Sequence, residues 1–143
     1  MNAQSLATIV NDGPLVGFRI SERWGLVAEI GYQAVPDVLI LRQSELGLTS
    51  AELNVMLNLT AHWWRSQDFV FPGAATIARR MNVTQRTVQR IISSLARKGF
   101  IRKCRTAKGE IFFDLAPLKE KLIPLAEKSL REKRQMRLLR EMG

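Results

Sequence analysis

The chain has 143 residues, of which 46% are hydrophobic, and Cys104 is its one cysteine. This length suits one ordinary domain with extensions and is too short for two independent cores. The N-terminus lacks the charged start and apolar run of a secretory signal, and a lone cysteine excludes an intramolecular disulfide, so we expect a cytoplasmic protein. Charged or turn residues interrupt every apolar run, which excludes a membrane-spanning helix and argues against a membrane partner.

The net charge of +9 is unevenly distributed along the chain. Residues 1–78 hold four arginines and seven acids, whereas residues 79–143 hold eighteen lysines and arginines and six acids. Within the second part, residues 79–109 contain ten basic residues and no acid. Such a block repels itself unless it meets a polyanion, and ordinary solvated faces mix both signs. The distribution favours nucleic acid as the partner.

Residues 1–34 are predicted to be an N-terminal extension. Residues 1–13 contain an Asn-Asp-Gly turn signal and are typical of a loose tail. Over residues 14–41, apolar residues mix with two glycines and a proline, and this pattern does not decide between a hairpin and short helices.

Clear helical signals begin at Thr49. Thr49 and Glu52 have the spacing of a capping box, and apolar residues then recur at helical intervals as far as Trp64. We therefore expect a helix over about residues 50–65. Residues 69–71 end at a Pro-Gly pair, which predicts a short strand closed by a turn.

Residues 74–98 predict two helices joined by a tight turn. A short helix over 74–81 ends at Asn82-Val83, Thr84 is placed to cap a second helix, and Gly99 suits its left-handed exit. Around the second helix, one stripe is apolar and the opposite stripe is mostly basic: Val88, Ile91, Ile92 and Leu95 against Arg86, Arg90, Ser93 and Arg97. The apolar stripe is expected in the core and the basic stripe at the surface.

A basic hairpin over residues 101–114 follows the second helix. Its two strands flank the turn Ala107-Lys108-Gly109, and its bases include Arg102, Lys103, Arg105 and Lys108. The expected fold class is mainly α with a small β-hairpin wing, that is, a winged helix-turn-helix DNA-binding domain over residues 35–116.

Several short motifs between residues 35 and 122 resemble those of a known group of domains. They are a Val-Pro-x-x-Leu-like segment from Val35, a Leu-Thr helix start, Phe71-Pro72, Ala78, the pairs Val83-Thr84 and Thr87-Val88, LARKGFI at 95–101 and FDLAPL at 113–118. The group is the winged helix-turn-helix domain family of bacterial, plasmid and phage replication initiators and transcriptional regulators. This resemblance implies that residues 84–98 form the recognition helix and residues 101–114 the wing.

The expected DNA contacts follow from the geometry of the grooves. A helix entering the major groove reads bases with its N-terminal exposed side chains, and arginine suits guanine as glutamine suits adenine. The predicted base-reading residues are Gln85, Arg86, Gln89 and Arg90. Contacts to phosphate or to the adjacent minor groove are expected from Arg97, Lys103, Arg105 and Lys108. Thr76 and Thr84, near helix N-termini, are further phosphate candidates, and for Thr84 a role as a cap alone is at least as strongly indicated.

Other conspicuous residues are expected to be structural. Trp63 and Trp64 end an amphipathic helix, which favours core packing over base stacking, and Trp24 carries no clearer signal. His62, the single histidine, has no partner at metal or triad spacing. The sequence has no Gly-rich phosphate loop, Asp/Glu cluster or Cys/His set, so we expect no catalytic site, cofactor, metal or small-molecule ligand.

A basic helical segment is predicted over residues 117–143. Pro117 suits a first helical turn, and Leu118, Leu122 and Leu125 recur at the spacing of an apolar seam. Pro124 predicts a kink there, or a break after which a second helix runs to about Arg140. The seam favours a homodimer through this segment. A helix folded back on its own domain and a basic tail on DNA phosphates are the alternatives.

Together these features predict a non-enzymatic, sequence-specific protein that binds double-stranded DNA. The leading interpretation is a transcriptional regulator. A replication-initiation or accessory factor of a plasmid, phage or other mobile element is the close alternative, and the sequence does not separate the two. A protein- or RNA-interaction module is a third interpretation, because a winged helix or a basic surface also serves such partners.

Overall fold

A computed structural model of the chain describes residues 13–143, with side chains from residue 19 onward. The loose tail expected over residues 1–13 therefore lies outside the described residues, save for Gly13. The chain divides into two compact units, one ending at Ala34 and one spanning Val35–Gly143. In the described part of the chain, no helix is both long and apolar enough to cross a membrane.

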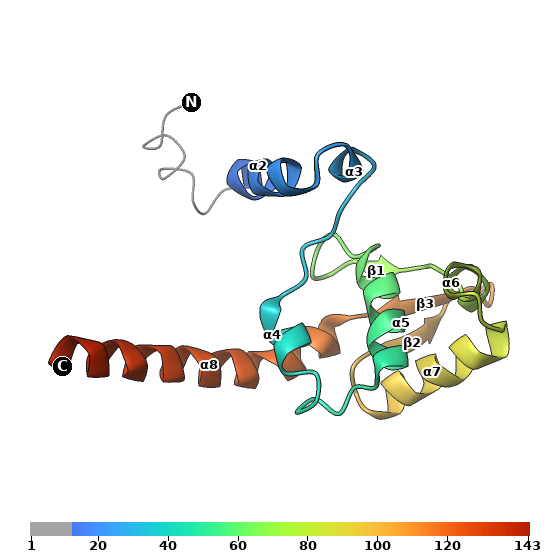
Figure 1. The fold of residues 1–143 in the computed structure, drawn as a ribbon. Helices are drawn as coiled ribbons and strands as arrows, with labels where there is room; N and C mark the ends of the chain where they lie inside the picture. The colour runs from blue at the N-terminus through green and yellow to red at the C-terminus, as the bar shows by residue number, and fades with distance from the viewer. Residues whose placement is uncertain (1–12) are drawn as a thin grey trace. The chain divides into compact units, whose positions relative to one another are not determined.

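The first unit is helical. It contains α2 (Gly13–Trp24) and α3 (Leu26–Glu29), which Figure 1 shows in blue. Gly25 separates them at φ 54°, in the left-handed region that glycine tolerates. Helices also follow in the second unit, where α4 spans Asp37–Leu41. The choice left open by the sequence between a hairpin and short helices is therefore resolved in favour of helices.

The second unit combines helices with a small sheet (Figure 1). The helices are α5 (Ser50–Thr60), α6 (Ala74–Met81), α7 (Gln85–Arg97) and α8 (Ala116–Met142), and the strands are β1 (Phe69–Val70), β2 (Arg102–Arg105) and β3 (Ile111–Asp114). All strand pairs are antiparallel, in the order β1-β3-β2. This confirms the expected fold class, a mainly helical winged helix-turn-helix with a small hairpin wing. The pairing of β1 onto the hairpin was not predicted.

One apolar core joins these elements. The apolar stripe expected on α7 is confirmed, since Val88, Ile92 and Leu95 are buried and Ile91 is partly buried. They pack with fully buried side chains of the neighbouring elements: Val55, Met56, Leu59, Val70, Ile77, Phe100 and Leu115. Burying each larger aliphatic or aromatic side chain contributes about 1.5–3 kcal/mol, so this core is the main reason why the sheet and helices hold together.

Glu52 is the one buried charged residue among those described. It completes the predicted capping box, because its backbone N–H donates to Thr49 Oγ1 at 3.1 Å and its Oε1 accepts from the Thr49 N–H at 2.9 Å. The same carboxylate accepts from Ser94 Oγ at 2.6 Å and from Lys98 Nζ at 2.7 Å. Burial raises the pKa of Glu52, but the bonds from Lys98, Ser94 and Thr49 outweigh burial and lower it to about 2.

The helix α8 runs unbroken through Pro124, so of the two alternatives expected there, a kink or a break, the break is wrong. Pro124 is exposed, and water can therefore solvate the backbone carbonyl that the missing proline N–H leaves unpaired. Leu118 and Leu122 anchor the first turns of α8 in the core. Farther along, Arg42 at the end of α4 donates to Glu132 Oε2 at 3.1 Å, which ties α8 to α4.

The buried carboxylate of Glu52 predicts a specific pH dependence of stability. Because its pKa is lowered in the folded chain, its contribution is complete above pH about 4.5 and is lost as the pH falls towards 2. A shift of this size is worth about 3 kcal/mol. The free energy of unfolding is measured in urea at neutral pH and near pH 2.5. Between these two pH values, the wild type should lose about 3 kcal/mol more of this free energy than Glu52→Gln. Glu110→Gln, at an exposed carboxylate, should behave as the wild type, and equal losses in all three proteins would contradict the assignment.

Candidate nucleic-acid interface

The turn between α6 and α7 fixes where α7 begins. Asn82 ends α6 with φ 54° and ψ 48°, a left-handed conformation that asparagine tolerates better than most residues. Two residues later, Thr84 Oγ1 accepts a hydrogen bond from the Thr87 N–H at 3.1 Å. Thr84 is thus the cap that the sequence predicted. The outward side of the first turns of α7 is exposed, and Figure 1 shows where α7 lies in the unit.

The four predicted base-reading residues lie together on these first turns. Gln85, Arg86, Gln89 and Arg90 are all exposed, on the side of α7 opposite the buried Val88 and Ile92. Arg97 is exposed as well, but it lies about 16 Å farther along the helix axis than Arg86. The structure therefore groups the four and separates Arg97 from them.

The two threonine candidates differ in their surroundings. Thr76 is partly buried in the first turn of α6. Thr84 is exposed, and its hydroxyl also shares a 2.8 Å hydrogen bond with Thr87 Oγ1. Because both contacts of Thr84 are internal, its observed role is that of a cap.

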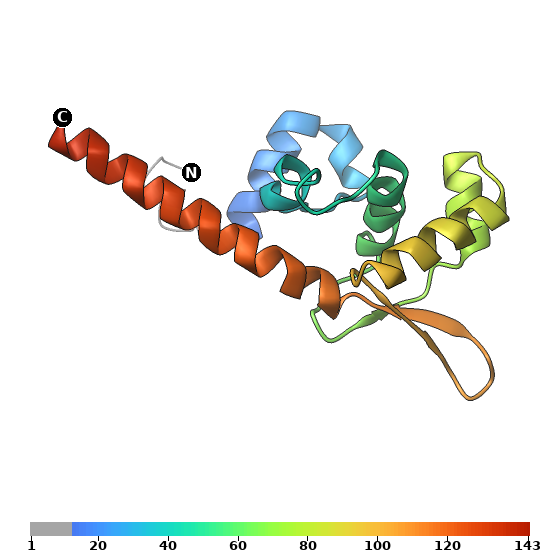
Figure 2. The ribbon, with the colours of Figure 1, turned by 90° about the horizontal axis from the view of Figure 1, so that it is seen from below.

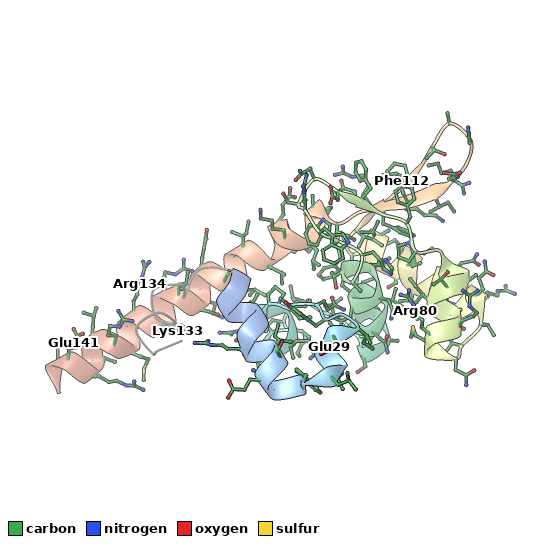
Figure 3. All side chains as sticks on the ribbon, turned by 90° about the horizontal axis from the view of Figure 1, so that it is seen from above. Glu29, Arg80, Phe112, Lys133, Arg134 and Glu141 are labelled. Carbon is green, nitrogen blue, oxygen red and sulfur yellow. The ribbon has the colours of Figure 1, made fainter. Side chains whose placement is uncertain are left out.

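A shallow hollow of about 370 Å³ lies between α6 and the start of α7, lined by Ala75, Ala78, Arg79, Asn82, Val83 and Gln85. Arg79 was not among the predicted site residues, although it opens the acid-free segment 79–109. It is exposed beside Gln85, where it extends the basic surface of α7 onto α6. Arg80 instead reaches α5 and His62 (Figure 3), with its guanidinium 3.3 Å from Asn58 Oδ1 and from His62 Nε2.

The hairpin carries the remaining candidates. The register pairs Lys103 with the buried Phe113 and Arg105 with Ile111, so Lys103 and Arg105 share one face of the sheet, and Lys108 lies in the turn. All three are exposed. Figure 2 shows the hairpin projecting from the unit beside α7. Arg102, on the other face, bonds Asp114 Oδ2 at 3.3 Å.

Most bases of segment 79–109 lack an acidic partner. Lys98 is paired with Glu52 and Arg102 with Asp114. Arg80 contacts Asn58 and His62. The other seven bases form no ion pair with a carboxylate among the residues that the structure describes: Arg79, Arg86, Arg90, Arg97, Lys103, Arg105 and Lys108. These unpaired charges on α6, α7 and the hairpin give a positive surface suited to a polyanion.

The residues expected to be structural fall into two groups. Trp63 packs against the core as predicted, whereas Trp64 is 84% exposed, so core packing is wrong for Trp64. The reason is that α5 ends at Thr60, which leaves Trp64 in the loop beyond it. His62 is at the surface against Arg80. Over residues 13–143, no three His, Cys, Asp or Glu side chains cluster as metal ligands would.

The fold and the positive surface define the class of the protein, a winged helix-turn-helix domain with an exposed basic surface. The model of one family, the DnaD N-terminal domain, matches residues 35–134. This chain belongs to the DnaD N-terminal domain family.

Comparison with solved structures agrees with this family. The N-terminal domain of DnaD from Geobacillus kaustophilus HTA426 is 28% identical, with a TM-score of 0.56 over 76% of this chain and 94% of that one. More distant similarities include YusO from Bacillus subtilis (19% identity, TM-score 0.44, 93% of this chain and 83% of that one). The structure of reduced AbfR bound to DNA is also similar, with 13% identity and a TM-score of 0.41 over 99% of this chain and 100% of that one. A search of curated protein sequences found no match.

The basic side chains of the hairpin that lack an acidic partner predict a salt-dependent contribution to DNA binding. Each of Lys103→Ala, Arg105→Ala and Lys108→Ala should weaken binding to all duplexes alike. Each should also reduce the slope of log affinity against log salt by about one, because one phosphate contact is lost. Titrations at several salt concentrations measure this slope. Lys119→Ala, an exposed base on α8, is the matched control, and slopes unchanged in all three hairpin variants would remove the hairpin from the interface.

Proposed function

We propose that this chain is a DNA-binding domain of the replication apparatus that recognises duplex DNA. The observation that carries the proposal is the exposed basic surface of α6, α7 and the hairpin, where seven bases have no acidic partner among the described residues. The family supports the biological role, because DnaD is a DNA replication and remodelling protein. In this role α7 enters the major groove, and the hairpin contacts the backbone or the adjacent minor groove.

Family membership favours replication over transcriptional regulation, which was the leading interpretation of the sequence. A winged helix serves either role, so the fold alone does not decide between them. Mapping the chromosomal sites that the protein occupies separates the two. Occupancy concentrated at an origin of replication supports the proposal, and occupancy confined to promoters contradicts it.

Within the interface, we assign two kinds of contact. Gln85, Arg86, Gln89 and Arg90 read base edges, since they share the exposed first turns of α7. Phosphate contacts come from Arg79, Arg97, Lys103, Arg105 and Lys108, with Thr76 near the start of α6. No group transfer or hydrolysis is assigned, and we propose that the domain acts by binding alone.

Removal of an arginine from α7 tests the base-reading assignment. Arg86→Ala and Arg90→Ala should each weaken binding to a duplex selected from a random pool by about 1–3 kcal/mol, because a bidentate contact to a base is lost. Each variant should also discriminate less between base pairs at one position of the site. A second selection from the random pool, carried out with the variant, would show this. Arg97→Ala is the control within the same helix and should weaken all duplexes alike. Wild-type affinity and an unchanged selected site in both variants would refute the assignment.

We further propose that residues 117–143 support a homodimer, with residues 35–116 as the DNA-binding domain and residues 1–34 as an extension. The helix α8 continues beyond the body of its unit in Figures 1 and 2. Its later turns expose Leu130, Met136, Leu138 and Leu139, each at least half exposed. A groove of about 830 Å³ runs between α4 and α8, lined partly by Leu41, Leu130 and Met136. A second copy would cover this apolar surface.

Sedimentation tests the dimer. The wild type should sediment as a dimer, and Leu130→Asp with Met136→Asp should shift it to a monomer, because burial of a carboxylate in an apolar interface is unfavourable. Arg131→Asp, at an exposed charged position of the same helix outside the lining of this groove, should leave the dimer intact. A dimer would present two α7 helices to half-sites about 10 base pairs, or a multiple, apart. A wild-type protein that stays monomeric both free and on DNA would rule out the dimer.

A further inference from the structure

The hollow between α6 and the start of α7 is partly apolar, although the surface around it is polar and basic. Three of its six lining residues are Ala75, Ala78 and Val83, and none of the six is acidic. Ala78 is buried, whereas Ala75 is exposed and the Val83 side chain is 39% exposed. Methyl groups therefore meet solvent in the middle of a basic surface. We call this feature the apolar hollow.

The turn that shapes the apolar hollow is fixed by backbone hydrogen bonds. The Val83 N–H donates to the Ala78 carbonyl at 3.1 Å, and the Asn82 N–H donates to the Arg79 carbonyl at 3.3 Å. The hollow is thus formed before any ligand arrives. A group that enters it requires little ordering of the protein, which favours binding.

The apolar hollow adjoins the surface to which we assign base reading. Gln85, the first residue of α7, lines it, and the Gln85 side-chain amide has no hydrogen-bond partner among the described residues. Arg79 is exposed in the same lining and has no acidic partner there. The occupant that fits is a small apolar group carried by an anionic ligand. In the major groove of DNA, the bases present one such group, the 5-methyl group of thymine.

We propose that the apolar hollow receives the 5-methyl group of a thymine and so selects an A·T pair beside Gln85. Glutamine bonds adenine at N6 and N7, and the thymine opposite that adenine carries its methyl group in the same groove. The inference rests on the proposed function, because it requires α7 in the major groove. It assigns a role in specificity to Ala75 and Val83, whose side chains carry neither charge nor polar atoms.

Removal of single methyl groups from the DNA tests this inference. Each thymine of a duplex selected from a random pool is replaced in turn by uracil, which lacks the 5-methyl group and keeps the hydrogen-bonding groups. Fluorescence anisotropy of the labelled duplex measures the affinity of the full chain. Replacement at one position should weaken binding about fourfold, because one methyl group is no longer buried.

Two variants assign this loss to the apolar hollow. In Val83→Ala, which removes methyl groups from the lining, the same replacement should weaken binding by less than about twofold. Ala75→Leu fills the hollow and should remove the discrimination in the same way. Both positions are exposed, so both variants should fold. Val27→Ala makes the same change at a 59% exposed valine outside residues 35–143 and should keep the full loss.

A further arm separates thymine from 5-methylcytosine, a second pyrimidine with the same methyl group. At the sensitive position, a T·A pair should bind more tightly than 5-methylcytosine paired with guanine, because the Gln85 amide suits adenine. Tighter binding of the 5-methylcytosine duplex would overturn the assignment to thymine.

Two other results would overturn the inference and leave duplex recognition by α7 intact. One is a selected duplex in which no replacement by uracil weakens binding. The other is a loss on replacement that persists unchanged in both Val83→Ala and Ala75→Leu. Failure of the proposed function is distinguishable from both, because the protein would then select no duplex sequence from the random pool.

Discussion

The buried carboxylate of Glu52 holds α7 in place. It caps α5 through Thr49, and it accepts hydrogen bonds from Ser94 and Lys98 on and just after α7. Lys98 also donates to the Gly47 carbonyl at 2.8 Å, so the end of α7 is tied to the loop before α5. An ionised carboxylate with this many donors is stable in a buried site, and removal of any one partner would leave a costly unpaired group.

The two ends of α7 differ in their surroundings: the C-terminal end is bound within the protein, and the N-terminal end is exposed. At its C-terminal end, Lys98 is engaged internally and the helix is anchored by Leu95 and Phe100 in the core. At its N-terminal end, Thr84 caps the helix, and the arginines that follow have no acidic partner in the described structure. Rigid support at one end and unpaired charge at the other are what a helix that enters a groove requires.

Local sequence signals predicted most of the fold. The capping box at Thr49, the turn at Asn82 and the exit at Gly99 each depend on residues within one helical turn, so their chemistry is visible in the sequence. The grouping of Gln85, Arg86, Gln89 and Arg90 followed from the predicted start of the helix at Thr84 together with the helical period. Arg79, in contrast, was missed because only the contact of α6 with the start of α7 brings it beside Gln85.

Features that depend on distant partners were not predictable in this way. The pairing of β1 with β3 joins residues more than forty positions apart, and it brings the rings of Phe69 and Phe112 together, with centroids 4.9 Å apart. The continuation of α8 through Pro124 depends on solvent exposure of that turn, which the sequence does not reveal. The outward position of Trp64 depends on where α5 ends, which is at Thr60 and not near residue 65 as the sequence predicted.

The central claim is that α7 and the hairpin together form the surface that meets duplex DNA. Amide chemical-shift changes on titration with a duplex selected from a random pool test it most directly, because they report on every part of the chain in one experiment. The claim predicts changes concentrated in residues 84–90 and 103–109, with residues 125–142 little affected. Changes concentrated in α8, with the first turns of α7 unperturbed, would contradict it.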